Sequence, residues 1–88
     1  MYQIPSYVRS VADSDGTTIL NLETNQILAL NSTGAYIWER LQRSEPVPEI
    51  VAALVDVTHA NQAEVDRDVK EFLADLLHRR LVATPGVG

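Results

Sequence analysis

The first third of the chain alternates apolar and polar residues in short runs, a pattern typical of β-strands. The three runs predict strands at residues 7–12, 17–22 and 26–30. Between them lie residues 13–16, Asp-Ser-Asp-Gly, which favour a tight turn, and residues 23–26, Glu-Thr-Asn-Gln, which are polar and also suit a turn. Because tight turns join antiparallel neighbours, the pattern predicts a small three-stranded antiparallel sheet.

Beyond the third strand the apolar residues recur every three or four positions, which is typical of amphipathic helices. We predict a first helix at residues 33–43, for which Asn31 or Ser32 supplies the N-cap. A second helix is predicted at residues 48–57, with Pro48 at its first position. The side chains expected on the buried faces of these two helices are Gly34, Ile37, Trp38, Leu41, Ile50, Val51, Leu54 and Val57.

A third helix is predicted to begin after Asn61, with Glu64 placed three residues later as in a capping box. Its apolar positions are Val65, Val69, Phe72, Leu73, Leu76 and Leu77. Residues 81–82 are expected to be extended, and residues 84–88 to form a frayed tail. The order of three strands and three helices predicts an α+β fold resembling a winged helix-turn-helix. We expect residues 1–88 to form a single domain with its core at residues 7–82.

The formal charge of −5 and the pI of about 4.7 argue against a nucleic-acid partner, because Lys and Arg contacts to phosphate dominate such binding. The third helix would be the recognition helix of a helix-turn-helix. Between Glu64 and Asp75 it carries five acidic and two basic residues, a local charge of −3 that phosphates would repel. The fold thus resembles a DNA-binding one, while its charge argues against that role.

Signals for catalysis and for cofactor binding are absent from the sequence. The chain has no cysteine, which fits a cytoplasmic protein. His59 and His78 lie nineteen residues apart without metal-ligand spacing, so we interpret them as a turn residue and a helix-end cation. No phosphate-binding glycine loop or nucleophile motif occurs, and neither a signal peptide nor a membrane span is recognisable. We therefore expect a protein that is not an enzyme and needs no metal or cofactor.

The acidic residues of the third helix leave three interpretations open. Asp66, Asp68, Glu71 and Asp75 alternate with Arg67 and Lys70. They fit a solvated helix face with local ion pairs, a catalytic or metal-binding carboxylate cluster, or an acidic rim that pairs with basic residues of a peptide. The first interpretation fits the spacing best. Trp38 shares its helical face with apolar residues, so we assign it to the core rather than to a stacking platform.

Residues 28–38, LALNSTGAYIW, resemble the signature of the PqqD-like leader-peptide recognition domains of ribosomal peptide natural-product pathways. Residues 47–51 resemble the start of that family's second helix, and Asp68-Val69 with Phe72-Leu73 and Leu76 its third helix. Residues 81–82 match its closing segment, although Arg80 stands where the family usually has glycine. Within this family, residues 20–25 resemble the stand-alone proteins of lasso-peptide clusters more than they resemble the pyrroloquinoline quinone protein.

The resemblance implies a binding protein that presents the leader of a precursor peptide to a separate cysteine protease and to a cyclase. Its unpaired third strand would accept the leader as an extra strand, in a groove against the third helix. The predicted peptide-binding residues are Gln26, Ile27, Leu28, Ala29, Leu30, Asn31, Val65, Asp68, Val69, Phe72, Leu73, Asp75 and Leu76. Two alternatives remain: an adaptor that docks a folded partner through its first two helices, and a small acid-catalysed enzyme.

Overall fold

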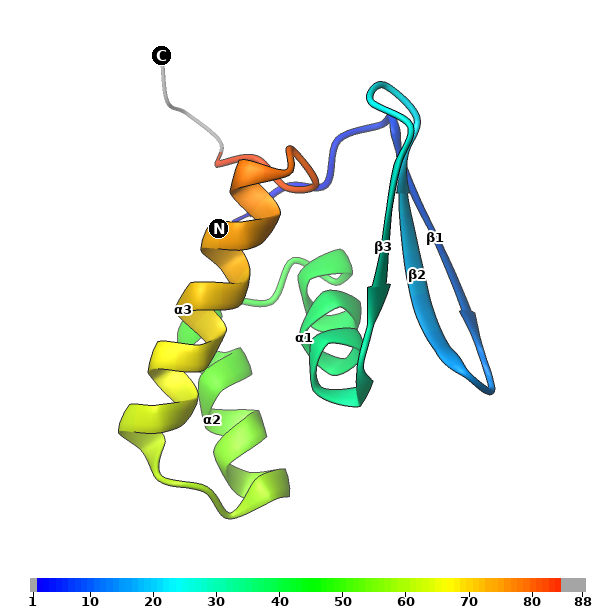
Figure 1. The fold of residues 1–88 in the computed structure, drawn as a ribbon. Coiled ribbons are helices and arrows are strands. Elements are labelled where there is room, and N and C mark those ends of the chain that lie inside the picture. The colour runs from blue at the N-terminus through cyan, green and yellow to red at the C-terminus, as the bar shows by residue number, and fades with distance from the viewer. Residues whose placement is uncertain (1, 85–88) are drawn as a thin grey trace.

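The computed structural model describes residues 2–84 and contains three strands followed by three helices (Figure 1). The elements are β1 (Val8–Asp13), β2 (Gly16–Asn21), β3 (Gln26–Leu30), α1 (Ser32–Gln42), α2 (Val47–Thr58) and α3 (Gln62–His78). The predicted α+β order is confirmed, and the predicted bounds are correct to within one residue wherever the sequence defined them. The tail predicted at residues 84–88 lies outside the described residues except for Thr84.

The strands form one antiparallel sheet in the order β1-β2-β3, with Ile19 of β2 opposite Ser10 and Leu28. Asp13 pairs with Gly16 across a two-residue turn, and Gly16 has a φ of +132°, which L side chains rarely adopt. Within residues 2–84 no strand pairs with the outer edge of β3. The edge strand that the sequence predicted is therefore present.

The hydrogen-bond alternation in the sheet determines which backbone groups of β3 lie at this open edge. The Leu22 amide donates to the Tyr7 carbonyl at 2.9 Å, so even-numbered residues of β2 exchange bonds with β1. Odd-numbered residues of β2 then bond to their partners in β3, which are residues 26, 28 and 30. The remaining backbone groups of β3, those of Ile27 and Ala29, point to the open edge.

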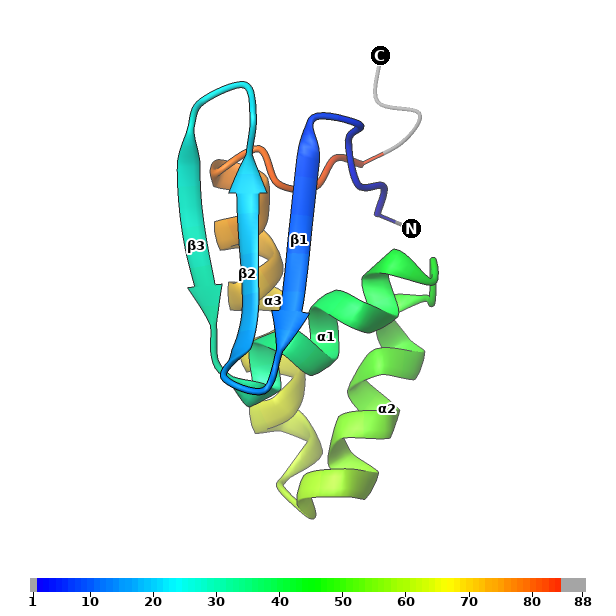
Figure 2. The same ribbon diagram turned by 90° about the vertical axis from the view of Figure 1, so that its right-hand side faces the viewer.

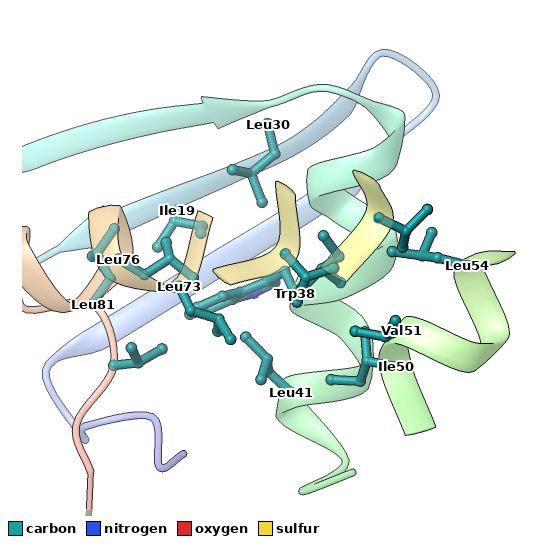
Figure 3. Close-up of a cluster of buried hydrophobic side chains, with 14 of the residues drawn as sticks. Ile19, Leu30, Trp38, Leu41, Ile50, Val51, Leu54, Leu73, Leu76 and Leu81 are labelled. Carbon is teal, nitrogen blue, oxygen red and sulfur yellow. The ribbon is translucent and has the colours of Figure 1, made fainter. Parts of the chain in front are cut away.

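The two faces of the sheet differ sharply in burial. Val8, Ile19 and Leu30 point inward and are buried, whereas Val11 and Ile27 point outward and are 65% and 68% exposed. Helices α1 and α3 cover the inner face, and α2 lies beside α3 away from the sheet (Figures 1 and 2). The apolar core lies between the inner face and the helices, with Trp38 at its centre (Figure 3).

The helix starts follow the predicted capping chemistry. Asn31 Oδ1 accepts a hydrogen bond from the Gly34 amide at 2.8 Å, and Asn61 Oδ1 accepts from the Ala63 amide at 2.8 Å. The prediction that Val57 is buried was wrong, because this side chain is 63% exposed. It lies in the last turn of α2, where it borders an open hollow with Tyr36 of α1 instead of packed chain.

The two ends of the described chain meet beside the core. Gln3 and Ala83 exchange backbone hydrogen bonds of 2.8 Å, and the preceding Leu81 and Val82 are buried. Residues 81–82, which were predicted to be extended, instead form a bend, and the bridge lies at the next residue, Ala83. Arg80 adopts a left-handed conformation with a φ of +60°, and its carbonyl accepts a hydrogen bond from the Tyr7 hydroxyl at 3.1 Å.

Candidate functional site

A cavity of about 410 Å³ lies where the C-terminal end of β3 meets the three helices. Its floor is apolar and its rim is polar. No residue of β3 itself lines it, although Asn31 follows that strand directly. The lining residues are Asn31, Thr33, Gly34, Ile37, Leu54, Thr58, Ala60, Val65, Asp68, Val69 and Phe72.

Gly34 allows the start of α1 to approach α3 closely enough to form one wall of this cavity. A Cβ atom added at Gly34 would lie 3.3 Å from Asn31 Oδ1, 3.4 Å from Phe72 Cε1 and 3.5 Å from Leu30 Cβ. The last residue of β3, the cap of α1 and the aromatic ring of α3 therefore meet at one point. A larger residue at position 34 would have to displace the Phe72 ring or the capping side chain.

The contribution of α3 divides into a buried floor and an accessible wall. Val65 and Val69 are 8% and 1% exposed and close the floor, while Phe72 is half-buried at the wall. Asp68 is exposed at the rim, and among the described lining residues it alone carries a charge. An apolar side chain fits this floor, and Asp68 sets the charge at its entrance.

The carboxylates of α3 differ in how closely a cation approaches them. Lys70 Nζ lies 2.9 Å from Asp66 Oδ2, and Arg79 Nε lies 3.0 Å from Asp75 Oδ2. The ion pair of Asp68 is longer, because Nε of Arg67 lies 3.8 Å from Asp68 Oδ1 and both side chains are 67% exposed. The solvated-face interpretation is thus correct for Asp66 and Asp75, while Asp68 remains weakly compensated.

At the end of the hairpin farther from the cavity, a buried side-chain amide joins the β2–β3 turn to the end of α3. Asn21 is fully buried, and its Oδ1 accepts hydrogen bonds from the amides of Glu23 and Thr24 at 2.9 and 3.1 Å. Its Nδ2 donates to the Arg79 carbonyl at 3.3 Å, so the β2–β3 turn is bonded to the end of α3. The hairpin thus approaches α3 at two points, near Gly34 at the end of β3 and through Asn21 at the β2–β3 turn.

The structure brings together most of the predicted site residues. Gln26 to Leu30 form the open strand, and Asn31, Val65, Asp68, Val69 and Phe72 line the cavity at its end. Leu73 and Leu76 are only 2% and 0% exposed, so they belong to the core and a ligand cannot contact them without repacking. Asp75 carries the Arg79 ion pair and lines no part of the cavity.

Sequence reasoning missed the cavity's contribution from α1 and α2. It placed the walls of the binding pocket on the third strand and third helix, but six of the eleven lining residues come from the first two helices and the turn after α2. The missed residues are Thr33, Gly34, Ile37, Leu54, Thr58 and Ala60. Gly34 after a capping Asn was the only local signal, and it indicates a close approach without naming the partner.

Within residues 2–84, no group of three or more His, Asp or Glu side chains is placed to hold a metal ion. His59 caps the end of α2 and His78 ends α3, as predicted. No helix in this part of the chain is both long and apolar enough to cross a membrane. What the site does offer is unpaired backbone at β3 beside an apolar cavity.

Open backbone on an edge strand, with an apolar cavity at its end, defines a small winged-helix-like binding domain. The family model for Coenzyme PQQ synthesis protein D (PqqD) matches residues 16–82, and the chain belongs to this family. The resemblance seen in residues 28–38 is thereby confirmed. No curated protein matches the chain.

Two solved structures share the fold over nearly their whole length. TbiB1 in complex with the TbiA(beta) leader peptide is 28% identical, with a TM-score of 0.88 over 98% of each chain. Lasso peptide synthetase B1 complexed with the leader peptide is 16% identical, with a TM-score of 0.88 over 94% of this chain and 98% of that one. The second likeness is one of fold alone.

Proposed function

We propose that this protein binds the leader segment of a ribosomally made precursor peptide without catalysing a reaction, residues 7–82 acting as one recognition domain. The observation that carries the proposal is the open edge of β3, which leads directly into the cavity through Asn31. The 28% identical TbiB1, whose structure contains a leader peptide, supports it. Because ribosomal peptides are made in the cytoplasm, we place the protein there.

The backbone of the peptide would pair with Ile27 and Ala29, whose amide and carbonyl groups point to the open edge of β3. Antiparallel pairing is slightly more stable per residue than parallel pairing, so we assign the peptide that direction. Its N-terminal part would then lie beside Asn31 and the cavity, and its C-terminal part beside the β2–β3 turn. Ordering a flexible leader costs about 2–5 kcal/mol, which burial in the cavity must exceed.

We further propose that a leader-cleaving cysteine protease, and a cyclase after it, receive the peptide from this domain. The outer face of the sheet supports such docking. Four large apolar side chains are exposed among residues 2–84. Val11 and Ile27 lie on that face by strand alternation, and Leu22 lies in the turn directly after β2. A bound peptide strand would widen the same face. The fourth, Val57, lies on α2, where the alternative adaptor function would place a folded partner.

Amide hydrogen exchange tests the proposal at the level of single residues. In the free protein, the amides of Leu28 and Leu30 should be protected by β2, whereas those of Ile27 and Ala29 should exchange rapidly. Adding a synthetic leader, with the TbiA(beta) leader as the first probe, should protect Ile27 and Ala29 selectively. Protection confined to α1 and α2 would instead favour the adaptor function, and a scrambled peptide is the control.

A further inference from the structure

We propose that Asp68 selects peptides carrying a lysine or arginine beside the apolar residue that fills the cavity. This inference rests on the proposed function and specifies the class of peptide that the site accepts. The cavity has an apolar floor formed by Ile37, Val65 and Val69, and Asp68 stands at its rim. A peptide side chain anchored in the cavity therefore lies next to this carboxylate.

The local charges leave Asp68 available for a cation from outside the chain. The neighbouring acids Asp66 and Asp75 each hold a cation at 2.9–3.0 Å, whereas the Arg67 guanidinium reaches Asp68 only at 3.8 Å and is itself highly exposed. Glu64 and Glu71 lie one turn before and after Asp68 and add negative potential to the same rim. A basic residue beside the anchor would complete the pairing, while an acidic one would be repelled.

The geometry also limits where the basic residue stands in the peptide. Asp68 lies on the same wall as Val65, Val69 and Phe72, which line the cavity from α3. A cationic side chain of the peptide reaches it only from a residue adjacent to the anchor or one position further, because an extended chain advances about 3.3 Å per residue. The selection therefore concerns a short motif, an apolar residue flanked by a base, and not the overall charge of the leader.

Selection from a random library of linear peptides tests this inference without knowledge of the natural leader. The wild-type protein should enrich peptides with Lys or Arg within two positions of an aromatic or aliphatic anchor. Asp68→Asn should lose this enrichment, and Asp68→Lys should replace it with Asp or Glu. Asp66→Asn is the matched control, because it changes the same charge on the same helix at a residue that does not line the cavity.

Binding measurements with the peptide that the wild-type protein enriches most give the size of the affinity change caused by Asp68→Asn. Asp68→Asn should weaken its binding about two- to fivefold at low salt, and the difference should shrink as salt rises. Asp66→Asn should change binding less than twofold. Two outcomes would overturn the role of Asp68 while leaving peptide binding intact. The wild-type protein could enrich peptides without a basic residue, or Asp68→Asn could enrich the same basic residue as the wild type. A selection that enriches no linear peptide would overturn the proposed function and this inference with it.

Discussion

The side chain of Asn21 donates a hydrogen bond to the main-chain carbonyl of Arg79, 58 residues further along the chain. The same side chain accepts two hydrogen bonds from the turn that starts β3. A single buried amide thus links the hairpin that carries the open edge to the end of the helix that lines the cavity. At the other end, the ring of Phe72 lies so near Gly34 that a Cβ atom there would be 3.4 Å from it.

Replacing Asn21 by Ala should lower the free energy of unfolding by about 2–4 kcal/mol, because three hydrogen bonds are lost and buried donors and an acceptor are left unpaired. Urea unfolding followed by the fluorescence of Trp38, which is buried and is the chain's only tryptophan, measures this change. Thr24→Ala is the control, since only the Thr24 backbone bonds to Asn21. Equal stability of the two variants would show that the Asn21 bonds do not hold the hairpin.

Replacing Phe72 by Ala should weaken peptide binding while the protein stays folded. The ring is half-buried, so its removal should cost about 1–3 kcal/mol, less than for a fully buried Phe. Leu73→Ala, at the next position but in the core, should cost about 2–5 kcal/mol and leave the affinity of the folded fraction unchanged. Thermal unfolding and peptide titration of both variants separate the two roles. Unaltered affinity of folded Phe72→Ala would remove Phe72 from the site.

Replacing Ala29 by Pro should abolish strand addition without unfolding the sheet. The substitution removes an amide that points to the open edge and places a ring where the peptide backbone would lie, a position where edge strands tolerate proline. Peptide affinity should fall at least about tenfold, or 1.4 kcal/mol. Leu28→Pro should unfold the protein, because the amide of Leu28 bonds to β2. If Ala29→Pro binds as tightly as the wild type, the peptide does not pair with β3.

Replacing Ile27 by Glu should leave peptide affinity within about twofold and impair delivery to the protease. The Ile27 side chain lies on the outer face of the sheet, away from the cavity, so it would meet the peptide only as a cross-strand neighbour on that face. Val57→Glu is matched in exposure, at 63% against 68%, and should leave delivery intact. Leader cleavage by the partner protease, measured beside peptide binding, gives both readouts. Loss of cleavage with Val57→Glu alone would place the partner on α2.

Replacing Arg80 by Gly should stabilise the protein by about 0.5–1 kcal/mol. Arg80 has a φ of +60°, a backbone conformation that is strained for an L side chain but not for glycine. For a domain of this size the midpoint of thermal unfolding should rise by several degrees. Arg80→Ala removes the same side chain, including its weak 4.0 Å contact with Glu23, but keeps the strain. A melting temperature that rises equally in both variants would assign the effect to the side chain instead of the backbone.

The sequence by itself determined the local structure of this protein. Alternation placed the strands, the three- and four-residue spacing placed the helices, and Asn31 and Asn61 marked two helix starts, because these features depend on neighbours within one turn. The signature in residues 28–38 also gave the family. Even the identity of the edge strand followed from chain order, since short turns leave the third strand next to only one neighbour.

Only the tertiary structure decided which of these residues meet. Val69, Phe72, Leu73 and Leu76 share one apolar pattern in the sequence, yet Leu73 and Leu76 enter the core while Phe72 faces the cavity. Helical spacing gives the direction of a side chain from its own axis but not what lies opposite. Val57 and Leu54 show the same limit. Both lie on the apolar face of α2, one turn apart, but other elements cover only Leu54, so Leu54 is buried and Val57 is exposed. Gly34 lets the start of α1 lie close to the Phe72 ring of α3, and no local pattern encodes an approach between residues so distant in sequence.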